Sequence, residues 1–246
     1  MSKNVYFLSD LHLGASYLQN PLECEKRVVR FLDSIKDKAS EIYLLGDILD
    51  YWYEYRHVVP KGYVRFLGKL AELADSGIKI HWFIGNHDIW IFNYLPQELG
   101  IEVTDGIMVK DIMGKRFFLN HGDAVGKRKA SFLFIRWIFR NKVCQFLYSM
   151  LPSCLTIPFA HNWSSHSRKA ENNDCINAAL YNITNFAKEH AQSNPDIDFY
   201  VFGHLHTIAN EPIKDTTRCI VLGDWINKFS YAVFDGENIT IENFNN

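Results

Sequence analysis

Five short groups of Asp, Asn and His side chains each follow a run of apolar residues. These groups are Ser9-Asp10-Leu11-His12, Gly46-Asp47, Gly85-Asn86-His87-Asp88, Asn120-His121-Gly122-Asp123 and Gly203-His204-Leu205-His206. Oxygen and imidazole donors without thiolates suit Mn²⁺, Fe²⁺ or Zn²⁺ better than a soft-metal or iron–sulfur site. In a D-x-H or H-x-H triplet of extended chain, the two outer side chains point to one side, where they can share an ion or serve two neighbouring ions.

The donors are more numerous than one ion requires. The seven candidate ligands are Asp10, His12, Asp47, Asn86, His121, His204 and His206. Two ions about 3.5 to 4 Å apart, bridged by a carboxylate, would use all seven, activate water and stabilise the attacking and leaving oxygens of a displacement at phosphorus. The pattern therefore predicts a hydrolase with two divalent ions, Mn²⁺ being preferred over Fe²⁺ or Zn²⁺. The alternative is that buried Asp and His side chains merely satisfy one another.

The elements that must position these donors alternate along the chain. Short apolar runs rich in β-branched and aromatic residues predict strands at 4–8, 41–45, 78–84, 116–119, 198–202 and 218–222. Amphipathic segments predict helices at 22–38, with Val28, Val29, Phe31, Leu32 and Ile35 on the apolar face, and at 64–75, with Val64, Leu67, Leu70, Ala71 and Ala74. A hairpin is expected at 231–244, turning at Asp235-Gly236. This alternation indicates an α/β fold, in which strand ends converge on one crevice.

Composition limits the class of protein. The 246 residues include 26 Lys and Arg against 28 Asp and Glu, a net charge of −2, which excludes a generally cationic nucleic-acid coat. We expect one domain over residues 1–246 and no nucleic-acid partner. The five Cys residues form no CxxC pair, which argues against a disulfide framework and a thiolate zinc site. Neither a secretory signal nor an apolar run of about 18 residues occurs, so we expect a cytoplasmic protein.

Residues 124–170 differ from the rest of the chain. They contain no Asp or Glu but eight basic residues, a charge of +8, which leaves −10 for the remainder. The same stretch is rich in Phe, Ile, Leu and Trp. A basic, apolar, helical insertion is what an anionic lipid surface or a phosphorylated amphiphile attracts. The alternative is a core helix pair with solvated arginines.

The ordered motifs SDLHLG, GDILD, GNHD, HGD and GHLH resemble those of the calcineurin-like metallophosphoesterase superfamily from residue 5 to about residue 224. The resemblance implies two β-sheets flanked by helices and a dinuclear site at the strand ends. It implies that Asp10, His12 and His206 hold one ion, that Asn86, His121 and His204 hold the other, and that Asp47 bridges them. His87 would be the general acid or a phosphate binder, and Asp88 would orient it.

Within that superfamily the chain is similar to the UDP-2,3-diacylglucosamine diphosphatases of lipid A biosynthesis. The similarity rests on the size, the N-terminal SDLHLG, the aromatic residues after GD and the helical insertion. It implies cleavage of a UDP-linked diacylated glucosamine to UMP and the sugar 1-phosphate, by an enzyme peripheral at the inner membrane. One departure is His87, where better-known members have Arg.

The resemblance also implies a set of substrate contacts. The candidates are Asn86, Arg128, Lys129, Ser165, Arg168 and Lys169 for phosphate or sugar, and Phe132, Phe134, Trp137, Ile138 and Phe139 for acyl chains. Tyr51, Trp52, Tyr53 and Tyr55 either pack a loop against the sheet or form a wall for uracil or sugar. Alternative functions are a general phosphodiesterase or phosphoprotein phosphatase and a non-enzymatic scaffold. The oligomeric state and acyl-chain length are not predicted.

Overall fold

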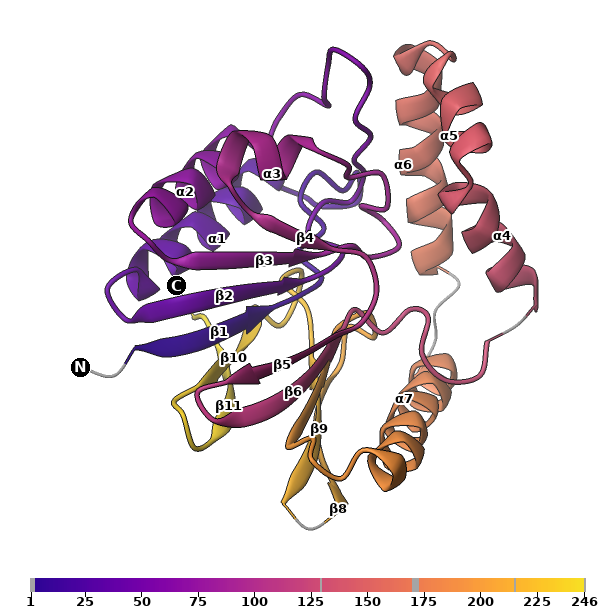
Figure 1. Ribbon diagram of the computed structural model, residues 1–246. Coiled ribbons are helices and arrows are strands. Elements are labelled where there is room, and N and C mark those ends of the chain that lie inside the picture. The colour runs from indigo at the N-terminus through magenta and orange to yellow at the C-terminus, as the bar shows by residue number, and fades with distance from the viewer. Residues whose placement is uncertain (1–2, 129, 170–172, 215, 246) are drawn as a thin grey trace.

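The computed structural model describes residues 3–128, 130–169, 173–214 and 216–245. Two β-sheets pack face to face, and helices cover their outer faces (Figure 1). This arrangement confirms the α/β class and the layered architecture that the motifs implied. The donor-bearing loops lie at one end of the two sheets.

The first sheet has the strand order β11-β10-β1-β2-β3-β4. Strands β1 to β4 are parallel, and β10 pairs antiparallel with both β1 and β11. Its strands are β1 (Asn4–Leu8), β2 (Ala39–Leu45), β3 (Lys79–Phe83), β4 (Glu102–Thr104), β10 (Ser230–Phe234) and β11 (Ile239–Asn243). The predicted hairpin is β10–β11, and Asp235 accepts the turn N–H groups of Glu237 and Asn238.

The second sheet has the strand order β5-β6-β7-β9-β8. Its strands are β5 (Met108–Ile112), β6 (Lys115–Asn120), β7 (Phe199–Phe202), β8 (Ile208–Lys214) and β9 (Thr217–Leu222). Strands β6, β7 and β9 match predicted segments. The sequence pattern missed β4, β5 and β8, because β4 is only three residues long, β5 has charged residues between its apolar ends, and β8 is mostly exposed.

Aromatic side chains fill the space between the sheets. Phe7 of β1 stacks on Phe117 of β6 at a centroid distance of 5.6 Å, and Phe117 meets Phe234 of β10 edge-on at 5.0 Å. All three side chains are buried. Successive side chains of a strand point to opposite faces of the sheet. Strands such as β1 and β7 are buried at nearly every position, so the outer face of each sheet is also apolar and requires helices to cover it.

Helices α1 (Pro21–Ile35) and α2 (Val64–Asp75) cover the first sheet. Asn20 caps α1 by accepting the backbone N–H of Glu23, and Val28, Phe31, Leu32 and Ile35 are buried as predicted. The predicted apolar face of α2 is confirmed at Leu70, and in part at Leu67 and Ala74, but is wrong at Val64. Its buried residues are Phe66, Leu70 and Leu73, and Val64 is 75% exposed. The helix turns its bulkiest aromatic residue inward, which rotates the face away from Val64. The short helix α3 (Tyr94–Leu99) precedes β4.

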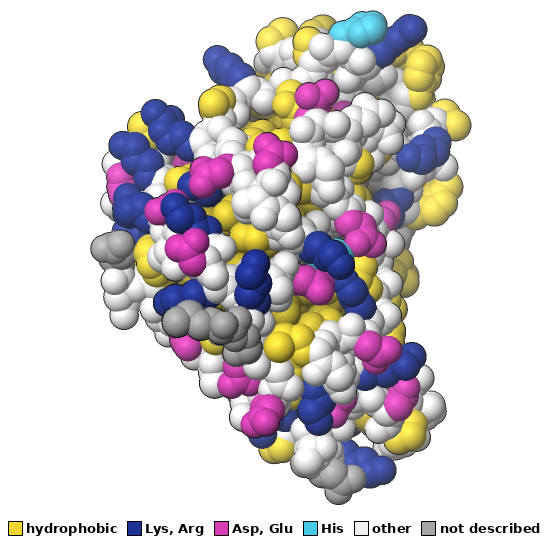
Figure 2. Space-filling model, turned by 60° about the vertical axis from the view of Figure 1, so that its left-hand side comes forward, with side chains coloured by type: hydrophobic (Ala, Val, Ile, Leu, Met, Phe, Trp, Pro, Cys, Tyr) yellow, Lys and Arg dark blue, Asp and Glu magenta, His cyan; other side chains and the backbone are white. Residues whose placement is uncertain are grey.

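The predicted insertion forms three helices, α4 (Ala130–Arg140), α5 (Lys142–Ser149) and α6 (Ser153–Lys169), which we call the cap. The cap stands on the side to which β1, β2 and β3 point, while α7 (Asn173–Ser193) covers the second sheet (Figure 1). No residue of α4 is buried. On the face shown in Figure 2, basic and acidic side chains are interspersed, without a large field of one sign.

Candidate metal centre

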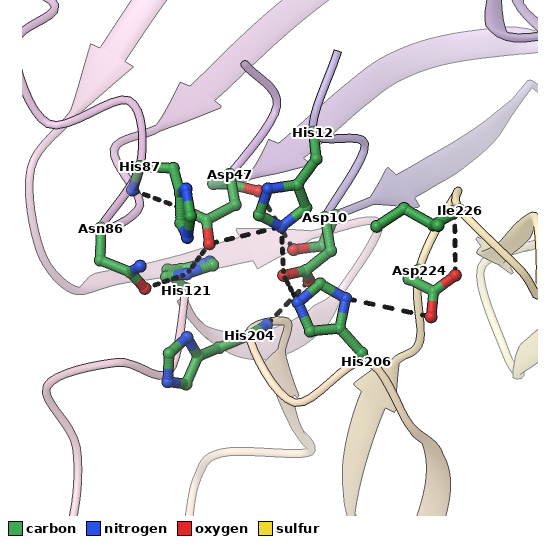
Figure 3. Close-up of polar contacts among 12 residues, drawn as sticks. Asp10, His12, Asp47, Asn86, His87, His121, His204, His206, Asp224 and Ile226 are labelled. Atoms are coloured by element: carbon green, nitrogen blue, oxygen red, sulfur yellow. Dashed lines mark hydrogen bonds and ion pairs between the residues drawn. The ribbon is translucent and has the colours of Figure 1, made fainter. Parts of the chain in front are cut away.

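All seven predicted donors converge at the carboxyl ends of five strands (Figure 3). Asp10 and His12 follow β1, Asp47 follows β2, and Asn86 follows β3. His121 follows β6, while His204 and His206 follow β7, so both sheets contribute. The crevice at the strand ends is therefore shared between the sheets, as the strand order predicts.

Asp10, His12 and His206 form one group of donors, whose ligand atoms all lie within 4.8 Å of one another. Asp10 Oδ1 lies 3.8 Å from His12 Nε2 and 3.6 Å from His206 Nε2. Both Asp10 and His12 are fully buried. Three donor atoms therefore face one small volume without touching one another.

Asp47, His121 and His204 form a second group, within the same limit of 4.8 Å. His121 Nε2 lies 3.3 Å from Asp47 Oδ2 and 3.3 Å from Asn86 Oδ1. The same Asp47 oxygen lies 3.7 Å from His12 Nε2 of the first group. Asp47 therefore stands between the two groups, where a bridging carboxylate must be.

The donor loops hold unusual backbone conformations. Asp10, His12, Asp47, His204 and His206 have φ values of 57°, 44°, 53°, 71° and 49°. Non-glycine residues adopt this left-handed region rarely, and each instance costs about 1 to 3 kcal/mol. Such strain persists only where the surrounding structure overdetermines it, and here it coincides with the donors of the crevice.

Two glycines allow the loops to approach one another. A Cβ at position 85 would lie 2.2 Å from Asp47 Oδ1, and one at position 203 would lie 1.9 Å from Ser9 Oγ. In the native loops, Asp47 Oδ1 accepts the backbone N–H of His87 at 2.8 Å, and Asp10 Oδ2 accepts that of His204 at 2.8 Å. Each carboxylate thus keeps its other oxygen for the crevice.

The imidazoles are oriented by their outer nitrogens. His121 Nδ1 donates to the carbonyl oxygen of Leu45 at 2.8 Å, and His12 Nδ1 donates to Asp50 Oδ1 at 3.2 Å. His206 Nδ1 lies 3.9 Å from Asp224 Oδ2. A donor hydrogen bond at Nδ1 leaves the Nε2 lone pair of that ring for a metal ion, the usual arrangement around ligating histidines.

The electrostatics of the crevice favour a bound cation. Burial raises the pKa of Asp10 and Asp47, but the neighbouring imidazoles, chiefly His206 and His121 respectively, lower each pKa below its ordinary value. Burial lowers the pKa of His121, yet Asp47 raises it to about 10. Burial and the charge of His121 lower the pKa of His204 to about 4. The carboxylates are therefore ionised, and a bound cation would displace the proton on His121.

These residues fit a pair of divalent ions. Asp10 Oδ1 and His12 Nε2 are buried and make no hydrogen bond within the part of the chain that the structure describes. Buried polar atoms without partners are rare in native proteins and require an explanation such as an ion. The donor set of carboxylate, amide oxygen and imidazole is that of Mn²⁺, Fe²⁺ or Zn²⁺.

His87 lies beside both groups of donors, and its ring meets that of His12 edge-on at 4.6 Å. Asp50 is the carboxylate that faces it, with Oδ1 3.3 Å from His87 Nδ1. Asp88, which was expected to orient His87, instead accepts the backbone N–H groups of Gly85 and Ile48 and the indole N–H of Trp82. Because these donors occupy both carboxylate oxygens, Asp88 fixes the donor loop and Asp50 takes the orienting position.

The role of Asp50 was missed at the sequence level. It is the last residue of GDILD, three positions after Asp47. A second carboxylate this close to a predicted metal ligand could have indicated a partner for a nearby histidine. Burial raises the pKa of Asp88 to about 6, with the charge of Asp47 as the next cause. Asp88 therefore differs from Asp50 in its environment as well as in its hydrogen-bond partners.

A cavity of about 230 Å³ opens beside the donors, between the sandwich and the cap. The sandwich contributes Asp50, Tyr51, Asn86, His87, Ile89 and Trp90, and the cap contributes Ile138, Phe139, Cys144, Gln145, Tyr148, Phe159 and Ala160. Most of this lining is aromatic or aliphatic. Of the acyl-chain candidates, Ile138 and Phe139 line the cavity, whereas Phe134 and Trp137 are 61% and 58% exposed and stack on each other.

Of the basic residues predicted to bind substrate, the structure describes the side chain of Arg128. Arg128 donates to the carbonyl oxygen of Gly122, next to His121, and burial lowers its pKa. Arg136 forms an ion pair with the buried Asp123, which joins α4 to the donor loop. Lys129 lies outside the described residues, as do the side chains of Ser165, Arg168 and Lys169 at the end of α6.

Comparisons with known proteins give a matching family and several similar chains. Residues 3–207 match the calcineurin-like phosphoesterase family. A UDP-2,3-diacylglucosamine hydrolase of Porphyromonas gingivalis is 40% identical over 256 residues, covering 98% of each chain. A protein of the same name from Vibrio atlanticus is 23% identical, covering 97% of this chain and 96% of its own. Among solved structures, Yfce, a phosphoesterase from E. coli, matches with a TM-score of 0.49 and 19% identity, covering 98% of this chain and 92% of its own.

Proposed function

The chain belongs to the calcineurin-like phosphoesterase family, and from that premise we propose that it hydrolyses UDP-2,3-diacylglucosamine to UMP and 2,3-diacylglucosamine 1-phosphate in lipid A biosynthesis. The structural observation that carries this proposal is the apolar cavity, which opens at Asn86 and His87 beside the donor crevice. A phosphate anhydride can lie at the crevice while an attached acyl chain enters the cavity. A small, soluble phosphodiester would leave that apolar surface exposed to water.

We assign two divalent ions to the seven converging donors. Asp10, His12 and His206 would hold one ion, Asn86, His121 and His204 the other, and Asp47 both. When bound, such a pair stabilises developing charge at phosphorus and lowers the pKa of water. Our preferred ion is Mn²⁺, with Fe²⁺ or Zn²⁺ as alternatives, and the oxygen and imidazole donors without thiolate suit all three ions. The complete set of donors also favours an enzyme over a scaffold of the same fold.

His87 is assigned the proton transfer to the leaving group. Its Nδ1 faces Asp50 Oδ1 and the Asp50 carbonyl oxygen, both at 3.3 Å, so Nε2 is the nitrogen that gives its proton to the departing sugar phosphate oxygen. Its backbone N–H also binds Asp47 Oδ1 at 2.8 Å. The general acid and the bridging carboxylate are therefore held in one hydrogen-bonded unit, while water adds to the α-phosphorus and the P–O bond to the sugar phosphate breaks.

We assign two roles to the cap. It would bind the acyl chains of the substrate, and it would make a peripheral contact with the inner membrane. Phe139, Tyr148 and Phe159 present apolar surface to the cavity. On the outside of the cap, Phe134 and Phe146 are 61% and 64% exposed, within the acid-free stretch of the sequence. Aromatic side chains among basic residues favour an anionic lipid surface. No helix among the described residues is long and apolar enough to cross a bilayer.

Product identification tests the function. Purified protein is incubated with UDP-2,3-diacylglucosamine and Mn²⁺ in H₂¹⁸O, and the products are separated and weighed by mass spectrometry. We expect UMP and the diacylated sugar 1-phosphate in equal amounts, with one ¹⁸O atom in UMP because water attacks the α-phosphorus. A matched reaction uses the Asp47→Asn variant, which keeps the shape of the side chain and removes its charge.

Two outcomes would contradict the proposal. Label in the sugar phosphate would place the attack on the other phosphorus and remove the assigned role of His87. Rapid hydrolysis of nucleotide or chromogenic diesters without any UMP from the lipid-linked substrate would identify a general phosphodiesterase with the same metal centre.

A further inference from the structure

Three alternate tyrosines of the segment after β2 extend from the sandwich to the cap. Tyr51 Oη lies 3.2 Å from Tyr148 Oη on α5, and Tyr53 Oη donates to the carbonyl oxygen of Gln145 at 2.6 Å. Tyr55 Oη lies 2.9 Å from Thr156 Oγ1 on α6. Residues i, i+2 and i+4 of an extended segment point to one side, so all three hydroxyls reach the same surface. We call these contacts the tyrosine seam.

The tyrosine seam continues into both partners. On the sandwich side, Trp90 Nε1 donates to the carbonyl oxygen of Phe139 at 2.8 Å. On the cap side, Tyr148 Oη donates to the carbonyl oxygen of Thr156 at 3.3 Å and so ties α5 to α6. The Tyr53 ring also lies 5.4 Å from that of Trp90 and 5.0 Å from that of Tyr148. The seam is therefore a connected set of hydroxyl and indole groups, buried or half-buried.

The position of the cap decides whether the cavity exists. The cavity walls come from both sides, with Tyr51 and Trp90 on the sandwich and Phe139 and Tyr148 on the cap. No residue of helix α4 is fully buried, and α4 meets the core through the partly buried Phe139, whose ring lies edge-on to Trp90 at 5.4 Å. Hydrogen bonds are directional, and at the seam they determine the distance and angle between the two walls.

We propose that Tyr53 and Tyr55 are positioning residues that hold the cap in its cavity-forming orientation and thereby select substrates with a long apolar chain. This inference rests on the proposed function for its natural substrate. Neither side chain lines the cavity, so each acts through the helix that it binds. Asp47 and Asp50 begin the same segment, but the Tyr53 and Tyr55 hydroxyls bind Gln145 and Thr156 of the cap and none of the seven donors, so we expect the chemistry on a small substrate to be independent of these two hydroxyls.

The test is the double variant Y53F/Y55F, which removes two hydroxyls and keeps the aromatic packing. The control is Y231F, because Tyr231 donates to Glu242 at 2.6 Å far from the cap. With UDP-2,3-diacylglucosamine, we expect the KM of Y53F/Y55F to rise about tenfold with kcat within about twofold, since two hydrogen bonds are lost. Turnover of bis(p-nitrophenyl) phosphate should stay within about twofold.

Hydrogen exchange measured by mass spectrometry gives a readout that does not depend on any substrate. We expect faster amide exchange in α5 and α6 of Y53F/Y55F, unchanged exchange in β1–β3, and wild-type exchange throughout the cap of Y231F. If the wild type releases no UMP, the proposed function fails, and the exchange data still decide whether the seam holds the cap.

The inference is overturned by an unchanged KM together with unchanged exchange in α5 and α6. It is equally overturned if both substrates lose activity to the same extent, because the seam would then serve only the general stability of the fold. An effect of Y231F equal to that of Y53F/Y55F would also contradict it.

Discussion

The metal centre and the cap differ in how deeply their side chains are buried. In the metal centre, Asp10, His12 and Asp47 are buried, and five of the seven donors have left-handed backbone conformations. In the cap, Phe146 and Leu155 are 64% and 67% exposed, and no residue of α4 is fully buried. The sandwich therefore supplies a rigid site for chemistry at phosphorus. The cap supplies an apolar surface beside that site, part of it exposed to solvent.

The comparison also extends to charge. Residues 124–170 carry +8 and the rest of the chain −10. The buried carboxylates Asp10 and Asp47 face the donor crevice, whereas Asp and Glu are absent from the segment proposed to meet an anionic lipid surface. Variants of the metal centre should therefore lower turnover, whereas variants of the cap should weaken binding to lipid.

The largest effect is expected for Asp47→Ala. Asp47 Oδ2 faces both donor groups, so its loss should disturb both ions and lower kcat by about three orders of magnitude or more. Turnover of the lipid-linked substrate and of a chromogenic diester should fall together, because both use the metal centre. The control is Asp37→Ala at an exposed site. Retention of more than about a tenth of wild-type kcat would contradict the bridging role.

A smaller and more selective effect is expected for His87→Gln. General acid catalysis contributes about 10²- to 10⁴-fold, and a good leaving group needs it less. We expect kcat to fall about 100-fold for the lipid-linked anhydride and much less for bis(p-nitrophenyl) phosphate, measured at saturating Mn²⁺. A rise in KM with unchanged kcat would instead show that His87 binds phosphate.

The positions of the seven donors could be predicted because each follows an apolar strand. Parallel strands place such residues at one edge. In the structure both carboxylates follow strands of the first sheet, and the imidazoles follow strands of both sheets. The partner of His87 could not be predicted in the same way. Asp88 adjoins it in sequence, but the turn directs that carboxylate to Gly85 and Ile48, and Asp50 comes from another loop.

The inward faces of α2 and α4 were also predicted only in part, because tertiary contacts decide them. The face of α2 depends on tertiary packing, and Phe66 is buried beside Trp82 of β3 where Val64 had been expected. In α4 the sequence pattern indicated an apolar helix but not its orientation, so Phe134 and Trp137 could not be separated from Ile138 and Phe139, which line the cavity. Local periodicity predicts elements, whereas their rotation is decided by tertiary contacts.

On the cap, the double variant F146S/L155S should weaken binding to vesicles of phosphatidylglycerol and phosphatidylcholine by about tenfold, because two large apolar side chains no longer enter the lipid surface. Co-sedimentation measures the bound fraction. The control V58S/V64S removes apolar side chains that are 62% and 75% exposed outside the cap. Equal weakening by both double variants would show that the membrane contact is not confined to the cap.

The smallest effect is expected in the sandwich, at Glu41. The hydrogen bond from His81 outweighs the opposing effect of burial, and with those from Tyr43 and Lys110 it lowers the pKa of Glu41 well below 4.5. Such a group stabilises the fold above its unfolded pKa and loses that contribution as the pH falls toward the folded pKa. Glu41→Gln should therefore cost about 1 to 2 kcal/mol in urea unfolding at pH 7.

The cost of Glu41→Gln should shrink as the pH falls below 4.5, the ordinary pKa of this carboxyl. Glu237→Gln, at an exposed site, is the control and should change little at either pH. A cost independent of pH would mean that the charge of Glu41 does not stabilise the sandwich.

The central claim is best tested by the anomalous scattering of crystals grown with Mn²⁺ and measured on both sides of the manganese edge. The account predicts two peaks, one among Asp10, His12, His206 and Asp47 and the other among Asp47, Asn86, His121 and His204. A single peak, or peaks bound by other side chains, would contradict the paired centre on which the proposed hydrolysis depends.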